Sequence, residues 1–234
     1  MPHLEREGEV LILDLGEDEN RFTPHWIASV NGLLDEIDVE RPAALVTAAT
    51  GKFYSNGLDL DWMDRNPDRR TEFIDTVHAL LARVLTLPVV TVAAIQGHCI
   101  AAAAMLSMAH DLRIMRADRG FWCVNEVDLG LVFTPGMTAL LQARLPRQVA
   151  HLAMTTGRRY GGAECVTAGI VDAVAPSADE VRAVAVQQAR ALTEKSGDAL
   201  GKIKHRIYGP VIEQLQLGAW PADKPSPPVL TASP

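Results

Sequence analysis

The chain has 234 residues, which is enough for one large domain or for one domain with a small appendage. Nearly half of the residues are apolar, so a sizeable core is possible, and the net charge of −7 argues against nucleic acid as a partner, because phosphate binding needs a concentrated basic surface. The three cysteines lack a metal-binding spacing, no apolar stretch is long enough to span a membrane, and the N-terminus lacks a secretory signal. We therefore expect a soluble, cytoplasmic protein without a metal ion or a membrane partner.

The first part of the chain alternates apolar runs with amphipathic runs. Strands are expected over residues 10–15, 43–49 and 88–97. Apolar residues at helical spacing predict helices over residues 22–37 and 71–85. Thr23 in the cap position and Pro24 at the first helical position mark the start of the first helix. The third strand is mostly apolar, which is typical of a strand covered on both faces.

The second part of the chain is richer in helices. An alanine-rich stretch over residues 98–111 has no β-branched residue after Ile100 and predicts a buried helix. Short strands or extended segments are expected over residues 112–115, 120–127 and 170–175. Further helices are expected over residues 134–145, 147–157, 161–168, 178–195 and 197–208. Strands that alternate with helices indicate an α/β fold with parallel βαβ units, and the late run of helices predicts a separate layer or an assembly surface.

Two turns that follow predicted strands are candidates for one binding crevice, because ligands in open α/β sheets lie beyond the carboxyl ends of strands. The first turn, in "YSNGLDL", holds Asn56, Gly57 and Leu58, and the second opens the alanine-rich helix. A helix N-terminus offers unpaired amides and the positive end of a dipole, and Gly57 lets the first turn approach closely. Two amides, for example those of Leu58 and Ala102, would then converge on one oxygen, which is the geometry of an oxyanion hole.

A carboxyl group in "CVNEVDLGL" is the candidate proton carrier. Glu126 has apolar neighbours, and a carboxyl group in apolar surroundings has a raised pKa and can transfer protons near neutral pH. Asp128 is a second acid, and in an extended segment Glu126 and Asp128 share a face. Either acid could be the base, and their spacing alone does not choose between them.

Four motifs in the same order resemble the crotonase, or enoyl-CoA hydratase/isomerase, superfamily, and the resemblance covers roughly residues 8–208. The motifs are "YSNGLDL", "AAIQGHCIAAAAMLSMAHDLRI", "NEVDLGLVFTPG" and "TTGRRYGGAECVTAGIVDAVAP". The resemblance implies an α/β fold with a crotonase-like ββα spiral core over residues 1–175. It also implies a helical C-terminal trimerisation region over residues 176–216, so that the protein forms homotrimers or pairs of trimers. The proline-rich segment 217–234 is expected to be partly disordered.

The resemblance also implies the roles of the site residues. The amides of Leu58 and Ala102 are expected to hold a thioester oxygen, and Glu126 rather than Asp128 is expected to be the acid and base. The implied substrate is an acyl-CoA thioester, and no separate cofactor is expected because coenzyme A is part of the substrate. The residues expected to contact the substrate are Phe53, Ser55, Asn56, Gly57 and Asn125.

One departure from the family pattern bears on the reaction. Hydratases of this family use a second glutamate on the alanine- or glycine-rich helix, and the matching position here holds Met105. Water addition needs a second group to activate the water, whereas a double-bond shift needs only one base. The pattern therefore resembles the plant-type Δ3,Δ2-enoyl-CoA isomerases of fatty acid metabolism. The alternatives are an enoyl-CoA hydratase or another acyl-CoA reaction on the same fold, and a non-catalytic acyl-CoA-binding homologue.

Two further features are left open by the sequence. "AAAAM" replaces a glycine-rich turn, and alanine is strained there if the turn requires a positive φ. Several basic residues either meet the phosphates of coenzyme A or belong to a solvated charged face. They are Arg65, Arg69, Arg70, Lys202 and Lys204.

Overall fold

The computed structural model describes residues 1–37 and 43–218. Its strands are β1 (His3–Glu7), β2 (Val10–Asp14), β3 (Ala44–Ala48), β4 (Phe53–Ser55), β5 (Val90–Ile95), β6 (His98–Ile100), β7 (Leu112–Arg116), β8 (Trp122–Cys123) and β9 (Ala173–Ala175). Its helices are α1 (Pro24–Asp35), α2 (Leu60–Arg65), α3 (Arg70–Thr86), α4 (Ala102–Ala109), α5 (Pro135–Arg144), α6 (Arg147–Thr156), α7 (Gly162–Thr167), α8 (Ala178–Arg190) and α9 (Asp198–Gln216). Short 3-10 helices are η1 (Pro67–Arg69), η2 (Glu126–Leu129) and η3 (Thr193–Lys195).

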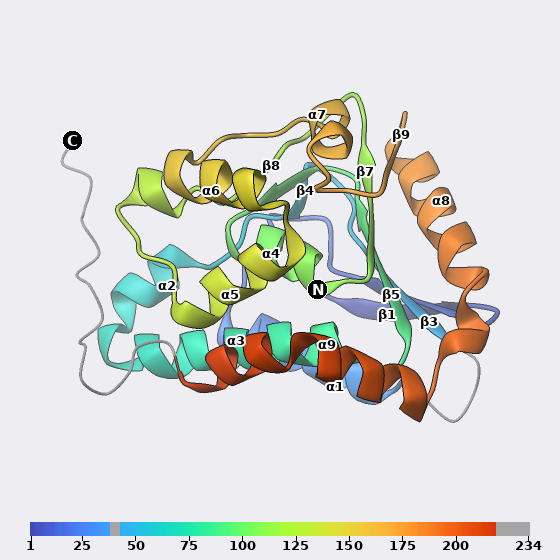
Figure 1. Cartoon of the computed structure of the whole chain (residues 1–234), viewed down its shortest axis with the longest axis horizontal. Helices are drawn as coiled ribbons and strands as arrows, with labels where there is room; N and C mark the ends of the chain where they lie inside the picture. The colour runs from blue at the N-terminus through green and yellow to red at the C-terminus, as the bar shows by residue number, and fades with distance from the viewer. Residues whose placement is uncertain (38–42, 219–234) are drawn as a thin grey trace.

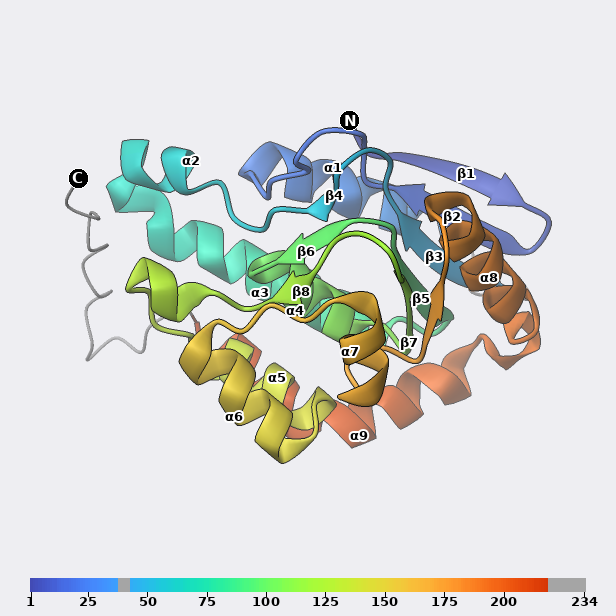
Figure 2. The same ribbon diagram turned by 90° about the horizontal axis from the view of Figure 1, so that it is seen from above.

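The strands form two sheets (Figure 1). The large sheet has the order β1-β2-β3-β5-β7-β9, in which β1 is antiparallel to β2 and the other neighbours are parallel. The small sheet has the order β4-β6-β8 and is parallel. The chain visits the large sheet, then the small sheet, then a helix, and repeats this path through β3-β4-α2, β5-β6-α4 and β7-β8-η2 (Figure 2). This repeat is a ββα spiral, and the expected α/β fold is confirmed.

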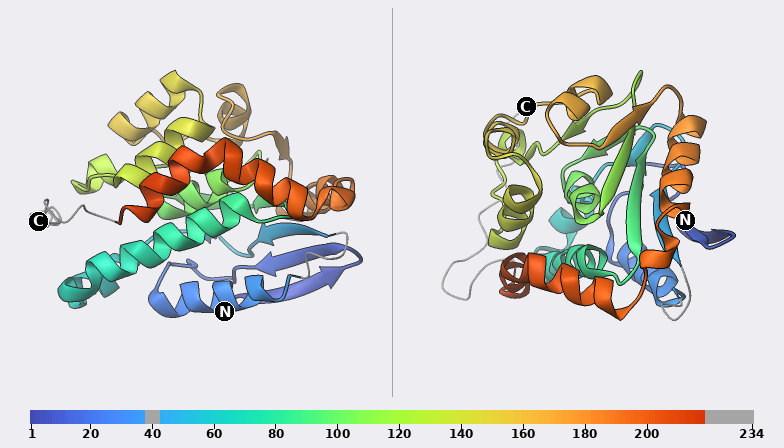
Figure 3. Two further views of the ribbon diagram at one scale, coloured as in Figure 1. Left: turned by 60° about the horizontal axis from the view of Figure 1, so that its bottom comes forward. Right: turned by 45° about the vertical axis from the view of Figure 1, so that its right-hand side comes forward.

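Helices cover both faces of the large sheet, which explains the nearly continuous apolar strands. Alternate residues of β2 belong to different cores, so that Leu11 faces one cluster and Ile12 faces the other. Helix α8 covers the Ile12 side, while α3 and α4 lie on the Leu11 side (Figure 3). The strand assignments over residues 10–15, 43–49 and 88–97 are confirmed by β2, β3 and β5.

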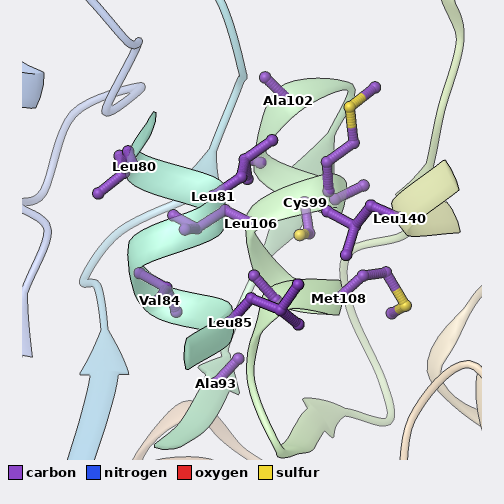
Figure 4. Close-up of a cluster of buried hydrophobic side chains, with 14 of the residues drawn as sticks. Leu80, Leu81, Val84, Leu85, Ala93, Cys99, Ala102, Leu106, Met108 and Leu140 are labelled. Atoms are coloured by element: carbon purple, nitrogen blue, oxygen red, sulfur yellow. The ribbon is translucent and has the colours of Figure 1, made fainter. Parts of the chain in front are cut away.

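Helix α4 lies at the centre of the molecule, and each of its eight residues is buried. A helix with no charged side chain and a small-residue first half can pack against neighbours on all sides. Figure 4 shows Leu81 and Leu85 of α3 beside Leu106 of α4 in this core. The buried helix expected from the alanine-rich sequence is therefore confirmed, but it begins at Ala102 and ends at Ala109.

Two local predictions are corrected by tertiary pairing, and one helix was missed. Residues 98–100 form β6 between β4 and β8, although propensity placed them in the helix. Only Trp122 and Cys123 of the segment 120–127 form a strand, and the following residues turn into η2. Helix α2 was not expected, and the Asp59 side chain caps it by accepting from the Trp62 amide at 3.0 Å.

Strand β1 was also missed, because it is an exposed edge strand held by its antiparallel pairing with β2. The start of α1 agrees with the sequence, since Thr23 caps the helix and Pro24 is its first residue. Within residues 1–37 and 43–218, no helix has the length and apolar character needed to cross a bilayer. The same residues contain no cluster of three or more His, Cys, Asp or Glu side chains suited to a metal ion.

The C-terminal region 176–216 comprises α8, η3 and α9, and α9 lies alongside α3 and α5 (Figure 1). Its role in trimer formation stays a prediction. Most of the proline-rich segment 217–234 lies outside the described residues.

Lys204 anchors the middle of α9 in the core. Its side chain is buried, and its ammonium group donates to the Val89 carbonyl at 2.8 Å and to the Asp111 carboxylate at 2.6 Å. Asp111 also accepts from the amide of Thr91 at 2.8 Å. A lysine held in this way is committed to an internal ion pair, so it is not available to the phosphates of a ligand.

The other basic residues considered for phosphate binding form ion pairs or donate to main-chain carbonyls near the surface. Lys202 pairs with Asp198, Arg69 with Glu72, and Arg70 with Asp64. Arg65 donates to the Asp61 carbonyl at 3.0 Å. None of these four side chains lines the cavity described below.

Replacing Lys204 by Met should lower the free energy of unfolding by about 3 kcal/mol, because the partly buried Asp111 carboxylate would lose its cation. Adding Asp111→Asn to this variant should cost less than the sum of the two single changes. Denaturant unfolding of the wild type, both single variants and the double variant measures this coupling. Strictly additive effects would contradict the ion pair.

Candidate active site

A cavity of about 250 Å³ lies where the turn after β4, the first turn of α4 and η2 meet. Its lining is mostly apolar, with polar groups at a few positions, as is usual for small-molecule sites. The lining residues are Arg21, Asn56, Leu58, Leu60, Met63, Ile74, Ile100, Ala101, Ala102, Asn125, Glu126, Leu129, Leu131, Val132, Thr134 and Met137. The two predicted turns therefore share one cavity.

The turn at Gly57 lies directly against the start of α4. Gly57 has a φ of +77°, and a Cβ atom at this position would lie 2.8 Å from the Ile100 carbonyl oxygen and 3.1 Å from the Ala102 nitrogen. Only glycine allows this approach without displacing the helix start. Gly57 thus brings Leu58 and Ala102 to the same cavity.

The amides of Leu58 and Ala102 both lack a hydrogen-bond acceptor among residues 1–37 and 43–218. The Phe22 amide donates to the Gly57 carbonyl at 2.7 Å, and the Asp59 amide donates to the Phe22 carbonyl at 3.0 Å. The Leu58 amide between them points away from Phe22, as alternating amides of an extended segment do. It has no acceptor within the described part of the chain, and the same holds for the Ala102 amide in the first turn of α4. Both N–H groups therefore belong to residues of the cavity lining and have no acceptor in the described part of the chain.

The residue before Ala102 is strained. Ala101 has φ 54° and ψ −121°, a conformation that glycine adopts easily and that residues with a Cβ rarely adopt. Its amide donates to the Cys123 carbonyl at 2.9 Å, which holds the turn against β8. The positive φ therefore falls on Ala101, and the Ala102 amide itself begins a regular helix.

Ser55 and Phe53 lie outside the cavity lining. The Ser55 hydroxyl donates to the Asn20 carbonyl at 2.7 Å and accepts from the Gly57 amide at 3.1 Å, so it holds the turn from behind. The Phe53 ring lies 5.4 Å from the His98 ring between their centroids, on the small sheet. Neither side chain contacts the space beside Glu126.

Asn56 and Arg21 do reach the cavity. The Asn56 amide group donates to the Glu19 carboxylate at 3.1 Å, and Arg21 forms an ion pair with the same carboxylate. The contact with Arg21 lowers the pKa of Glu19, so Glu19 remains charged. Arg21 was missed by the sequence analysis, because only the pairing of Phe22 with Leu58 brings its segment to the turn. The spacing of residues along the chain carries no signal of this pairing.

Glu126 lies in η2 and is the only acid among the described residues that line the cavity. Its side chain is 8% exposed, and burial raises its pKa to about 7. Neither its Oε2 atom nor the Oδ1 atom of Asn125 has a hydrogen-bond partner in the part of the chain that the structure describes. A carboxyl group in this state can accept and return a proton near neutral pH.

Asp128 lies in the same 3-10 helix as Glu126. It is exposed, does not line the cavity, and lies against Gly157, where a Cβ atom would be 2.7 Å from its Oδ2 atom. The expectation that Glu126 and Asp128 share a face of an extended segment is therefore wrong. The cause is the tight turn that ends at Gly130, which has a φ of +65°.

Met105 is fully buried in α4 and does not line the cavity. Thr134, Ile74 and Met137 line it; they lie within the predicted helices and were not among the predicted site residues. Their apolar or capping positions on α3 and α5 carry no sequence signal of a ligand site. Within the part of the chain that the structure describes, the cavity thus combines a carboxyl group with one partnerless oxygen, two amides without acceptors and an apolar wall.

Comparisons with known proteins give the same family throughout. The sequence profile described as enoyl-CoA hydratase/isomerase matches residues 7–218. "Enoyl-CoA delta isomerase 2, peroxisomal" of Arabidopsis thaliana is 34% identical over 218 residues, which cover 88% of this chain and 91% of that protein. "Enoyl-CoA delta isomerase 3" of the same plant is 34% identical over 227 residues, which cover 92% and 95%. The structure of human mitochondrial delta3-delta2-enoyl-CoA isomerase shares the fold with a TM-score of 0.82 at 22% identity, covering 92% of this chain and 85% of that chain.

Ala101→Gly should raise the free energy of unfolding by about 1 kcal/mol, because relief of the positive-φ strain exceeds the added entropy of the unfolded glycine chain. Denaturant unfolding measures the change, and Ala103→Gly in the same helix is the matched control. The control should be destabilised by about 1 kcal/mol, since Ala103 is a regular helical position. Equal losses in both variants would contradict strain at residue 101.

Glu126→Gln should stabilise the protein, and the gain should grow with pH. Burial raises the pKa of Glu126 from 4.5 to about 7, so the folded state holds the proton more tightly than the unfolded chain. The wild type therefore loses stability as pH rises from about 4.5 to about 7, by about 3 kcal/mol in total, whereas the glutamine variant does not. Unfolding curves collected across this pH range test the prediction, and a gap that is independent of pH would contradict the raised pKa.

Proposed function

The chain belongs to the enoyl-CoA hydratase/isomerase family, and we propose that it is an enoyl-CoA isomerase that converts a 3-enoyl-CoA into a trans-2-enoyl-CoA. The observation that carries this proposal is the single buried carboxyl group, Glu126, in one cavity with two unpaired main-chain amides. The Arabidopsis relatives, which are named delta isomerases and cover most of the chain, support it.

The two amides would stabilise the negative oxygen that forms during the reaction. The thioester oxygen accepts hydrogen bonds from the N–H groups of Leu58 and Ala102. When the second carbon of the acyl chain loses a proton, charge moves to this oxygen and forms an enolate. Loss of one such donor in other enzymes costs about 3–4 kcal/mol of transition-state stabilisation.

Glu126 would carry the proton between two carbons. Its carboxylate removes a proton from the second carbon, and the resulting carboxylic acid delivers a proton to the fourth carbon. The double bond moves from between the third and fourth carbons to between the second and third, and no electrons enter or leave. A pKa of about 7 suits this cycle, because the carboxylate and the acid are both accessible near neutral pH.

The alternatives have weaker support. Hydration needs a second group to activate water, and the helix position that carries it in hydratases holds the buried Met105 here. A protein that only binds acyl-CoA has no need for an unpaired buried carboxyl group, which costs folding free energy. Each observation favours a single-base reaction.

The other parts of the substrate would contact lining residues of matching polarity. The acyl chain fits the apolar side chains of Met63, Ile74 and Met137, and Asn56 and Asn125 offer polar contacts to the thioester part. Arg21 also lines the cavity, but its charge is paired with Glu19, so we assign it no phosphate contact. The proposal includes a cytoplasmic homotrimer, or a pair of trimers, assembled through residues 176–216.

Glu126→Gln should lower kcat for isomerisation of a 3-enoyl-CoA by about 10³-fold, because it removes the only acid of the cavity among the described residues. Asp128→Asn is the matched control and should keep kcat within about twofold. In the wild type, kcat/KM should fall about tenfold per pH unit below about 7, since only the carboxylate is the base.

The product is scored as 2-enoyl-CoA by chromatography, and a 2-enoyl-CoA is incubated in parallel to detect a 3-hydroxy product. Full turnover by the glutamine variant would rule out Glu126 as the base. Rapid formation of the 3-hydroxy product would replace the isomerase proposal by hydration.

A further inference from the structure

A buried histidine lies directly behind the inner wall of the cavity. His78 is in α3, one helical turn after the cavity residue Ile74, and its side chain is 1% exposed. Its Nδ1 atom lies 3.1 Å from the Leu215 carbonyl oxygen, and its Nε2 atom lies 2.8 Å from the Thr134 hydroxyl oxygen. One imidazole ring therefore joins α3 to the last turn of α9 and to the cap of α5.

The chemistry of the partners determines the direction of each hydrogen bond. A carbonyl can only accept, so Nδ1 carries the proton and donates to Leu215. Burial lowers the pKa of His78, which keeps the ring neutral, and Nε2 then accepts from the Thr134 hydroxyl group. The Thr134 oxygen accepts in turn from the Met137 amide at 3.2 Å. The relay fixes Thr134 and the start of α5 to the end of α9.

The same elements form the inner wall of the cavity. Ile74, Thr134 and Met137 all line it, and each side chain is almost completely buried. Gly136 lets α5 pack directly against α9, because a Cβ atom at this position would lie 2.7 Å from the Leu215 Cα atom. A wall made partly of flexible methionine would yield to a ligand unless its backbone were fixed.

We propose that His78 is a positioning residue that fixes this inner wall against α9 and thereby limits the length of the acyl chain that the cavity accepts. The inference rests on the proposed function in one respect, namely that the ligand is an acyl-CoA. His78 is not itself a lining residue of the cavity, and it acts through Thr134, which is one. Loss of the Thr134 contact should let the wall move outward, so that longer chains gain relative to shorter ones.

Two substitutions of His78 separate its two hydrogen bonds. Asparagine places an amide near the Nδ1 position, so His78→Asn keeps the donor to Leu215 and loses the acceptor for Thr134. Glutamine reaches the Nε2 position, so the carbonyl oxygen in His78→Gln can still accept from Thr134. If the wall depends on the Thr134 contact, glutamine should retain the wild-type preference and asparagine should not.

His110 provides a matched control. It is fully buried, and its ring contacts the Leu106 carbonyl at 2.8 Å and the Thr47 hydroxyl at 2.8 Å. Like His78, it thus contacts one main-chain carbonyl and one threonine hydroxyl, but in another part of the core. It does not line the cavity. His110→Asn should cost similar stability without changing the preference for chain length.

The experiment measures kcat and KM for short, medium and long 3-enoyl-CoAs. One methylene group in an apolar pocket is worth about tenfold or more in specificity, so His78→Asn should shift the ratio of kcat/KM, long over short, by about tenfold. The shift should appear mainly in KM, because Glu126, Leu58 and Ala102 are unchanged. If His78→Asn does not fold, Thr134→Val removes the same hydrogen bond from the other side.

Binding of saturated acyl-CoAs of the same lengths gives a readout that needs no turnover. A wild type that binds them but isomerises no 3-enoyl-CoA would refute the proposed function alone, and the affinity ratios would still judge the role of His78. Unchanged ratios in a folded His78→Asn variant, or in Thr134→Val in its place, would overturn the inference. So would a shift of equal size in His110→Asn, or a wild type that binds no acyl-CoA.

Discussion

The close approach of the Gly57 turn to the first turn of α4 is the constraint on which the site depends. Two main-chain segments, 45 residues apart in sequence, come close enough that a single added carbon atom at residue 57 would meet a carbonyl oxygen at 2.8 Å. The approach needs glycine on one side and small residues on the other, which is why the helix start is built of alanines. In the proposed function, these two backbone segments supply the binding site for the thioester oxygen without any charged side chain.

At the C-terminal end of α4, by contrast, the main-chain carbonyl groups have hydrogen-bond donors. Its last carbonyls receive cationic donors, since Arg113 donates to the His110 carbonyl at 2.8 Å and Arg144 donates to the Met108 carbonyl at 2.9 Å. Cations at a helix C-terminus are favourable because they face the negative end of its dipole. The helix is thus satisfied where it meets the core and left unsatisfied where it meets the cavity. In the proposed function, this asymmetry separates the part of the helix that supports the fold from the part that binds the substrate.

Glu126 shows the same contrast among the buried charged side chains of the described residues. Arg113 pairs with Asp172, Lys204 pairs with Asp111, and the carboxylate of Asp14 accepts from the Gly16 amide. Glu126 alone keeps a buried oxygen atom without a partner. An unpaired buried carboxyl group destabilises the fold at neutral pH, and such local losses are typical of sites where function limits stability. The other buried charged side chains in the described part of the chain all have partners, so a general lack of buried hydrogen bonds in the core does not explain the unpaired Glu126 oxygen.

The sequence predicted those features that depend on local pattern and missed those that depend on pairing at a distance. The apolar strands and the Thr23 cap follow from periodicity and capping chemistry, and the fold followed from ordered motifs. Arg21 could not be foreseen, because its place at the cavity results from a bridge between Phe22 and Leu58. The division between β6 and α4 was missed for the same reason, since it depends on the neighbouring strands and on the strained Ala101.

The C-terminal helix illustrates how far such long-range contacts extend into the site. Helix α9 is tied to the core at two points, through the Lys204 ammonium group near the large sheet and through the Leu215 carbonyl near the cavity. The first contact secures the helix by charge, and the second transmits its position to the cavity wall through a neutral ring. A change along α9 that disturbs either hydrogen bond, or the packing of Leu215 against Gly136, can reach the site. The helix is therefore a structural part of the cavity even though the cavity lining contains none of its residues.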